Sequence, residues 1–253
     1  MASKRHGTRP LTPTFWFAVA TLWPTLTVTT KRDWQGTENL RRTYPPDDGI
    51  VVVANHISWF DPFSMCHILW NNGRPPRILV KDTLFRAHGI KHIMRGAGQI
   101  PVARETQDAS AAVAQAVAAV RDGEAVVLYP EGTITRDEQL WPMTGRTGAA
   151  RIALETGAPV IPIAQWGPQD VMRPYRKEFH LLPRKTMHMR VGPPVDLDDL
   201  RDQPITAEVL DEATTRIIDA ITGLLAHLRG AEPPAQRLDY KDWKANQKKE
   251  EAS

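Results

Sequence analysis

The chain carries a histidine and a carboxylate in one short motif, residues 55–61, which reads Asn-His-Ile-Ser-Trp-Phe-Asp. His56 and Asp61 are five positions apart. A neutral imidazole is able to accept a proton from a hydroxyl near neutral pH. A carboxylate on the other ring nitrogen would fix the tautomer and stabilise the imidazolium. Because neither side chain is a strong nucleophile, the pair indicates activation of a substrate hydroxyl.

The same residues also suit a purely structural role. A strand followed by a turn often contains Asn, Ser and Asp, which bond to nearby backbone groups. Asp61 followed by Pro62 is typical of the first turn of a helix. The motif by itself leaves the catalytic and the structural interpretation open, and the segments around it decide between them.

Short apolar runs alternate with helical patterns along most of the chain, and one run, residues 50–54, directly precedes the histidine motif. Strands are predicted at 50–54, 77–80, 99–103, 124–129, 160–164 and 187–191, and helices at 61–70, 83–94, 108–121, 147–156 and 206–229. This alternation predicts an α/β fold with a central mixed, largely parallel sheet flanked by helices. Ligands of such sheets bind where strands end, so His56, Arg104 and Glu131 are expected at one crevice.

Two further motifs follow predicted strands. Arg104 ends the block 98–104, and an arginine there is suited to a forked contact with phosphate; an ion pair with Glu105 is the alternative. Residues 129–133 read Tyr-Pro-Glu-Gly-Thr, in which the glycine permits a tight turn and the amides and hydroxyl suit an anion. An ordinary turn is the alternative for this block.

The block 158–163 is apolar and contains two prolines. Prolines within a strand are typical of an edge or a bend. The block is therefore expected either to wall an apolar pocket or to serve the fold alone.

In this order and spacing, the blocks at 55–61, 98–104, 129–133 and 159–163 resemble the motifs of the glycerolipid acyltransferase family, most closely its bacterial 1-acylglycerol-3-phosphate (lysophosphatidic acid) acyltransferases. That family carries Asn-His-x-Ser-x-x-Asp, Gly-x-Ile-x-x-x-Arg, Phe-Pro-Glu-Gly-Thr and an apolar block with prolines. The resemblance covers roughly residues 35–195. Tyr129 replaces the usual Phe.

The resemblance implies transfer of an acyl chain from acyl-CoA or acyl-carrier protein to the free hydroxyl of 1-acylglycerol-3-phosphate, which gives phosphatidic acid without a metal or cofactor. His56 would be the general base, oriented by Asp61. The implied substrate-binding residues are Asn55, Ser58, Lys81, Arg104, Glu131, Gly132, Thr133 and Arg146, the last in place of a lysine common in the family. Backbone amides near Gly132, or the Asn55 side chain, would stabilise the oxyanion.

The first thirty residues indicate a membrane setting. Residues 11–30 contain no charged residue, include Trp16 and Trp23, and are interrupted by Pro13 and Pro24. Tryptophan prefers the headgroup interface. We therefore expect residues 1–34 to form a membrane-anchoring helical segment that lies in one leaflet, at the cytoplasmic face of the cell membrane. A cleaved signal peptide and a helix of a soluble core are the alternatives.

Composition supports one acyltransferase domain between the N-terminal apolar segment and a polar C-terminal tail. The 253 residues are 42% hydrophobic, and the formal net charge is +3, which is ordinary for a globular protein. Basic residues gather near the N-terminus and between residues 173 and 185, where membrane lipids are the expected partner and nucleic acid is not. The single Cys66 excludes an internal disulfide. Residues 35–230 are the predicted domain, and residues 231–253 a polar, disordered tail.

Three competing functions remain open on the sequence. The acceptor would instead be glycerol-3-phosphate, another lysophospholipid or a glycolipid. A non-catalytic lipid-binding module would need neither His56 nor Asp61. A metalloenzyme would combine them with His88 or His92, but the spacing usual for metal ligands is absent from the sequence.

Overall fold

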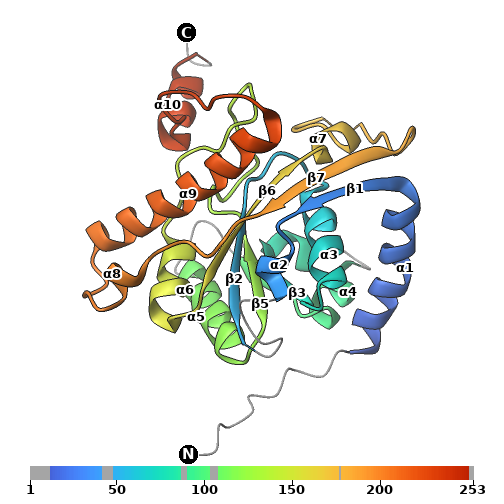
Figure 1. The fold of residues 1–253 in the computed structure, drawn as a ribbon, viewed down its shortest axis with the longest axis horizontal. Coiled ribbons are helices and arrows are strands. Elements are labelled where there is room, and N and C mark those ends of the chain that lie inside the picture. Colours follow the sequence, from blue (N-terminus) through green and yellow to red (C-terminus); the bar gives the residue numbers. More distant parts are fainter. Residues whose placement is uncertain (1–11, 42–47, 87–89, 103–107, 177, 251–253) are drawn as a thin grey trace, which may run out of the picture.

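The computed structural model describes residues 12–41, 48–86, 90–102, 108–176 and 178–250. In them a single sheet of seven strands, in the order β1-β7-β6-β2-β5-β3-β4, forms the centre of the molecule (Figure 1). Only β6 and β7 run antiparallel, so the expected mixed, largely parallel sheet is confirmed. The strands are β1 (Thr30–Gln35), β2 (Ile50–Ala54), β3 (Pro76–Lys81), β4 (Ile100–Val102), β5 (Ala125–Leu128), β6 (Val160–Trp166) and β7 (Lys185–Val191).

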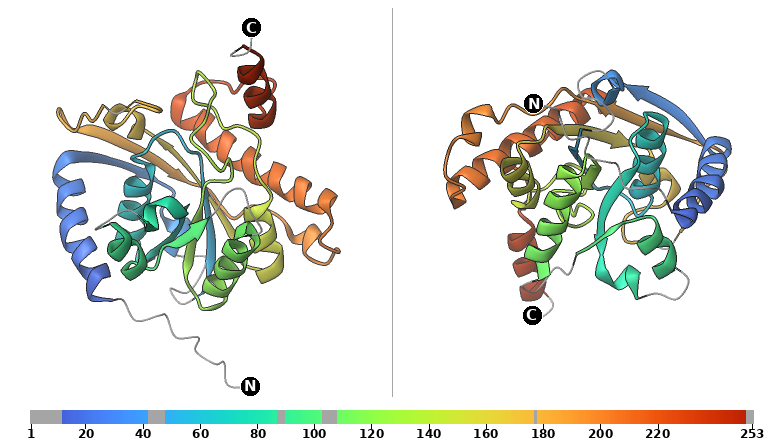
Figure 2. Two further views of the ribbon diagram at one scale, coloured as in Figure 1. Left: turned by 180° about the vertical axis from the view of Figure 1, so that it is seen from behind. Right: turned by 90° about the horizontal axis from the view of Figure 1, so that it is seen from below.

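Helices cover both faces of the sheet. Figure 2 shows α1 on the side of the molecule away from α5, α6 and α9. The helical elements are α1 (Pro13–Thr29), α2 (Glu38–Arg41), α3 (Asp61–Asn71), the 3-10 helix η1 (Asp82–Phe85), α4 (Ile90–Gly96), α5 (Asp108–Arg121), α6 (Gly148–Thr156), α7 (Pro168–Val171), α8 (Asp198–Arg201), α9 (Ala207–Arg229) and α10 (Tyr240–Glu250).

The sequence of strand β2 explains why both faces of the sheet are covered by helices. Its five residues are completely buried. Alternate side chains point to opposite faces of a strand. Val51 and Val53 therefore join the core formed with α5, α6 and α9, whereas Ile50 and Val52 join the core formed with α3. A parallel strand buried on both faces is expected to be continuously apolar, as this one is.

Several element boundaries differ from the sequence predictions. The segment predicted as one helix at 83–94 instead contains η1 and the separate α4. Strand β1 lies in a segment for which no strand was predicted. The proline-containing β6 is an interior strand rather than an edge. Pro162 is tolerated there because the β6–β7 ladder begins only at Ile163, so no ladder bond needs an N–H at position 162. The carbonyl of Pro162 still accepts from Gly192 N at 2.9 Å.

Within the tail at 231–253 that composition predicts to be disordered, the described residues up to 250 contain a helix. Helix α10 occupies Tyr240–Glu250, and the segment before it bonds to the rest of the protein. Composition favoured disorder because the segment is polar. The ordering comes from specific tertiary hydrogen bonds, which composition does not encode.

Helix α1 packs along the domain. The Thr12 hydroxyl caps it by accepting from Phe15 N, and also donates to Gly96 O at 2.5 Å. Phe15 and Leu26 are buried, whereas Trp16 and Phe17 are 53% and 61% exposed. None of the helices in the described ranges combines the length and the apolar character needed to cross a membrane. Anchoring by residues 1–34 stays a prediction, and residues 1–11 lie outside the described residues.

Candidate active site

His56 and Asp61 form a direct pair at the carboxyl end of β2. His56 lies two residues beyond the strand, and Asp61 begins α3. The distance from His56 Nδ1 to Asp61 Oδ2 is 2.7 Å. A proton on Nδ1 is donated to the carboxylate, which leaves Nε2 as the proton acceptor. The predicted pairing of these two side chains is thereby present in the structure.

The Asp61 carboxylate is held from three directions. Its Oδ2 accepts from His56 and also from Ile57 N at 2.7 Å and Ser58 N at 2.9 Å. The residue is 0% exposed. Burial raises the pKa of Asp61 above its usual value, while the hydrogen bonds from His56, Ser58 and Ile57 and the charge of a protonated His56 act in the opposite direction. The geometry fixes the carboxylate so that it orients the imidazole.

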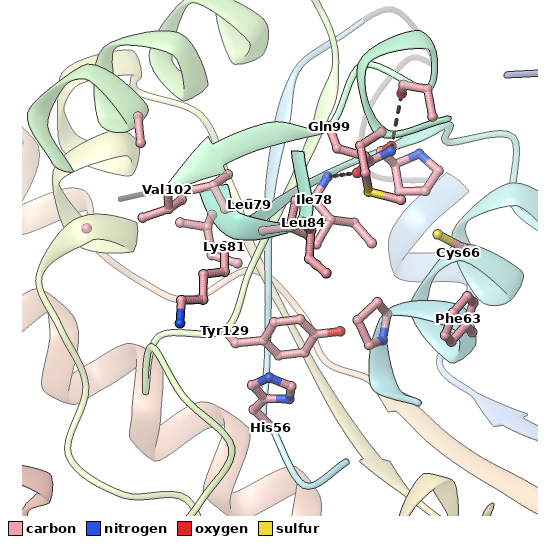
Figure 3. A pocket seen from close by; sticks show the side chains of 18 of the residues that line it. His56, Phe63, Cys66, Ile78, Leu79, Lys81, Leu84, Gln99, Val102 and Tyr129 are labelled. Carbon is pink, nitrogen blue, oxygen red and sulfur yellow. Dashed lines mark hydrogen bonds between the residues drawn. The ribbon is translucent and has the colours of Figure 1, made fainter. Parts of the chain in front are cut away.

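Tyr129 stacks on the histidine. Its ring centroid is 4.3 Å from that of His56, with the planes 21° apart, and Figure 3 shows the two rings one above the other. Burial raises the pKa of Tyr129 well above its usual value, so the phenol is neutral. Stacking on a neutral aromatic ring restricts the orientation of the imidazole without adding charge.

Glu131 holds the backbone of the histidine. Its two carboxylate oxygens accept from His56 N at 2.9 Å and from Met143 N at 3.0 Å. On the other side, Thr135 N donates to His56 O at 2.8 Å. Burial raises the pKa of Glu131 to about 8, although the two backbone bonds lower it. These bonds give Glu131 a positioning role, and the substrate contact predicted for it stays a prediction.

An apolar cavity of about 1030 Å³ opens beside the histidine. It extends from α1 and α3 past β3 to α5 and α6, and Figure 3 shows part of its wall around His56. Helix α1 contributes the side chains of Phe15, Leu22 and Trp23, and α3 contributes Phe63. A cavity of this size and apolar character suits a long hydrocarbon chain.

Three cationic residues line the same cavity: Lys81 at the end of β3, Arg146 before α6 and Arg151 within α6. Arg151 is paired with Glu155. Arg146 N donates to Pro130 O at 2.8 Å. Its side chain crosses Gly132, where an added Cβ would lie 2.8 Å from Arg146 Nε. Gly132 has φ +71°, a conformation that favours glycine, and a Cβ there would also displace the Arg146 side chain. The predicted residues Lys81, Gly132 and Arg146 are thus grouped around one space with His56.

Other predicted substrate contacts are not brought to the cavity. The Asn55 amide is buried and spans to β6, donating to Gln165 O at 3.0 Å and accepting from Gln165 N at 2.8 Å. The Ser58 hydroxyl is buried and donates to Met172 O at 2.6 Å. Thr133 is absent from the cavity wall. Arg104 lies outside the described residues.

Two of the predicted sources of oxyanion stabilisation, the Asn55 side chain and the Gly132 N–H, have other partners. The Asn55 amide is engaged by Gln165. The Gly132 N–H donates to Tyr129 O at 2.9 Å. These two donors are used within the fold, and stabilisation of the oxyanion by other amides near Gly132 stays a prediction.

Cys66 and His67 on α3 also line the cavity. Burial raises the pKa of the Cys66 thiol to about 12, which removes the thiolate needed for nucleophilic attack. Burial, together with the charge of Arg32, lowers the pKa of His67 to about 4. Among the described residues, no three His, Cys, Asp or Glu side chains are grouped closely enough to hold a metal ion.

Sequence reasoning missed the residues that orient the motif from outside it. One of them is Tyr129, which stacks on His56. The aromatic residue two positions before Glu131 was the sequence signal for this contact. Gln165 and Thr135 act through the backbone of Asn55 and His56. Gln165 donates through its side-chain amide, but nothing in the sequence links position 165 to Asn55. The residue type at position 135 carries no signal, because any residue other than proline would supply the same N–H.

The sequence of this chain matches a known protein family and several of its members. The Acyltransferase family model matches residues 31–166. A chloroplastic 1-acyl-sn-glycerol-3-phosphate acyltransferase of Brassica napus is 30% identical over 157 residues, which are 61% of this chain and 43% of that protein. A 1-acyl-sn-glycerol-3-phosphate acyltransferase of Borreliella burgdorferi is 23% identical over 188 residues, which are 72% of this chain and 70% of that protein.

A solved structure shares the fold. The crystal structure of the 1-acyl-sn-glycerophosphate acyltransferase of Thermotoga maritima superimposes with a TM-score of 0.65 at 20% identity, covering 87% of this chain and 81% of that one. The chain spans less than half the length of the Brassica napus protein. Because the family model matches more than half of the sequence, the chain belongs to the acyltransferase family.

Proposed function

We propose that the protein transfers a fatty acyl chain from a thioester to the free hydroxyl of 1-acyl-sn-glycerol-3-phosphate and so forms phosphatidic acid. The observation that carries the proposal is the buried His56–Asp61 pair at the wall of an apolar cavity that also contains Arg146 and Lys81. The names of the relatives in Brassica napus and Borreliella burgdorferi support this acceptor.

In the proposed reaction, His56 Nε2 accepts the proton of the acceptor hydroxyl. The resulting alkoxide oxygen attacks the thioester carbonyl carbon, a C–O bond forms and the C–S bond breaks. The imidazolium returns its proton to the departing thiolate. Asp61 stabilises the imidazolium in between. Direct transfer is favoured over an acyl-enzyme because the Cys66 thiol is un-ionised and the Ser58 hydroxyl is buried and engaged.

Different parts of the cavity suit the apolar and the charged groups of the two substrates. The apolar wall from α1 and α3 would hold acyl chains, and Arg146 and Lys81 would bind the acceptor phosphate, with Arg104 as a further candidate. The donor is acyl-CoA or acyl-carrier protein, and no cofactor is proposed.

A membrane location at the cytoplasmic face fits both the substrates and the exposed surface. The exposed apolar side chains include Phe17 and Val28 on α1, which form a first surface, and Phe179 and Leu182 after α7, which form a second. Arg184 lies beside the second surface and donates to Thr30 O at 2.7 Å. Apolar side chains next to basic residues suit the interface of an anionic leaflet. We propose peripheral binding through these surfaces rather than a span.

A product analysis tests the activity. Purified protein is incubated with labelled acyl-CoA or acyl-carrier protein and a panel of 1-acylglycerol-3-phosphate, glycerol-3-phosphate, other lysophospholipids and monoacylglycerol, and products are identified by mass. The expected product is phosphatidic acid. Arg146→Ala should raise KM for the phosphate-bearing acceptor by about tenfold, with no such change for monoacylglycerol. Transfer to another acceptor alone would contradict the proposed substrate.

Vesicle binding tests the location. Full-length protein should sediment with vesicles of phosphatidylcholine and phosphatidylglycerol, and Phe17→Ser combined with Leu182→Ser should weaken this binding. The matched control is Ile205→Ser, another exposed apolar residue, which precedes α9. Equal sedimentation of all three proteins would contradict the proposal.

A further inference from the structure

The segment that follows α9 is attached to the loop between β5 and α6. We name residues 237–243 the C-terminal clamp and residues 129–147 the β5–α6 loop. In the loop, Thr144 N donates to Leu238 O at 3.0 Å and the Thr144 hydroxyl donates to Asp239 Oδ2 at 2.8 Å. Arg237 forms an ion pair with Asp219 of α9, which fixes the clamp to the domain. Figure 1 shows α10 beside this loop at the end of the molecule where the chain terminates.

Asp239 serves both sides of the attachment. Its Oδ1 accepts from Lys241 N at 2.7 Å and Asp242 N at 3.3 Å, which caps the start of α10. Its Oδ2 accepts from the Thr144 hydroxyl. One carboxylate therefore starts the terminal helix and holds the loop.

A second contact joins the clamp to the other part of the loop. The Arg136 guanidinium carbon lies 4.5 Å from the ring centroid of Trp243 in the clamp and 3.5 Å from that of Tyr175. Tyr175 in turn donates its hydroxyl to Ile134 O. Arginine between two aromatic rings is a favourable cation–π arrangement. The loop is thus fixed at residues 134–136 as well as at Thr144.

These attachments lead to the histidine through a short chain of buried bonds. Met143 is adjacent to Thr144, and its N–H donates to Glu131 at 3.0 Å. The same carboxylate accepts from His56 N at 2.9 Å, and Thr135 N donates to His56 O at 2.8 Å. Both backbone groups of His56 are therefore held by the loop that the clamp holds.

We propose that Thr144 and Asp239 are positioning residues for acyl transfer: the C-terminal clamp fixes the β5–α6 loop, and the loop fixes the backbone of His56. The inference rests on the proposed role of His56 as the base. The loop has neither helix nor strand between residues 129 and 147. Its conformation is held by hydrogen bonds within the loop, such as that from the Thr135 hydroxyl to Trp141 O, together with its contacts to the clamp. A base displaced by about 1 Å is expected to slow the reaction by as much as about 10²-fold.

Substitutions at the contact test this role in the full-length protein. Thr144→Val removes the hydroxyl at nearly constant shape, Thr144→Ser retains it, and Asp239→Ala removes its acceptor. The matched control is Asp242→Ala, an acidic residue in the first turn of α10 whose backbone N–H, rather than its carboxylate, bonds to Asp239. Thr144→Val and Asp239→Ala should each lower kcat about tenfold and change KM for the acyl donor by less than about twofold. Thr144→Ser and Asp242→Ala should keep wild-type kcat.

Hydrogen exchange supplies a readout that does not depend on turnover. Peptides covering residues 55–58 and 140–146 should exchange faster in Thr144→Val than in Asp242→Ala. Unchanged kcat per folded molecule in Thr144→Val and Asp239→Ala, or unchanged exchange in these peptides, would overturn the positioning role. Failure of the proposed function is distinguishable, because it would appear as full turnover by His56→Ala.

Discussion

Two histidine–aspartate pairs in the described part of the chain have almost the same length. His56 Nδ1 lies 2.7 Å from Asp61 Oδ2, and His188 Nδ1 lies 2.6 Å from Asp33 Oδ2. The same ring nitrogen meets the same kind of carboxylate oxygen in both. Judged by distance alone, the two pairs are equally good candidates for a base and its orienting acid.

The surroundings separate them. The side chains of the first pair are 11% and 0% exposed, whereas those of the second are 40% and 45% exposed. His56 lines the apolar cavity and stacks on Tyr129, while His188 and Asp33 face each other across strands β7 and β1. An exposed pair of this kind adds little beyond joining two strands. A catalytic pair needs fixed orientation and access to a substrate in addition to a short hydrogen bond.

The largest expected difference is in turnover after removal of the histidine. His56→Ala should lower kcat by about 10²–10⁴-fold, the usual contribution of a general base. His188→Ala should have a kcat within about twofold of the wild-type value. Steady-state rates with an acyl thioester and 1-acylglycerol-3-phosphate measure both, with circular dichroism as the test of folding. Equal losses in the two variants would remove the distinction between the pairs.

Neutralising the carboxylate should give the next largest effect. Asp61→Asn keeps the shape of the side chain but loses the charge that stabilises the imidazolium, so kcat should fall by about 10²-fold. Asp33→Asn is the matched change in the exposed pair and should have no measurable effect on kcat. If Asp61→Asn turned over like the wild type, the orienting role of this carboxylate would be refuted.

Burial around the first pair should also appear in the pH dependence of stability. The pKa of Glu131 is about 8 in the folded protein, above its ordinary value of 4.5. In that interval the folded state keeps a proton that the unfolded state releases, so this residue's contribution is complete below about pH 4.5 and is lost as the pH rises through about 8. Each unit of such a shift corresponds to about 1.4 kcal/mol.

Glu131→Gln measures this contribution. Its free energy of unfolding should fall less between pH 5 and pH 8 than that of the wild type, as followed by urea unfolding at each pH. Glu124→Gln, which alters a partly buried carboxylate paired with Arg77, controls for a general effect of removing charge. Parallel pH profiles for wild type and Glu131→Gln would contradict the raised pKa.

The smallest expected effect is the coupling within the exposed pair. A double-mutant cycle with His188→Ala and Asp33→Ala should give a coupling free energy of about 0.2–1 kcal/mol, and less at high salt. Thermal unfolding at low and high ionic strength provides the measurement. A coupling well above this range would mean that exposure does not separate the two pairs as described.

The first pair was predictable because both of its determinants are local. A buried parallel strand has a continuous apolar sequence, and β2 ends where residues 50–54 predicted. The spacing of His56 and Asp61 then places one after the strand and the other at the start of α3. The residue types therefore predicted the buried strand and the candidate histidine–aspartate pair that follows it, whereas the central place of β2 in the sheet became visible only in the structure.

The remaining features depend on distant contacts that the sequence does not display. Asn55 and Ser58 were expected to bind substrate, but partners more than a hundred residues away use their hydrogen bonds. Strand β1 and helix α10 are largely polar, and their formation depends on β7 and on Thr144. Propensity and periodicity describe one segment at a time, so they do not reveal which polar group is already satisfied by another.

The single thiol in the cavity wall provides a built-in chemical reporter. Cys66 is the chain's only cysteine, so a thiol-specific reagent has one possible point of attachment in the unaltered protein. With a pKa of about 12, the thiol is almost entirely protonated at neutral pH and reacts slowly. Alkylation therefore requires that the cavity admit both reagent and solvent, and a bound acyl chain would shield the sulfur. The rate of alkylation at Cys66 therefore measures how often the cavity is open to solvent and free of an acyl chain.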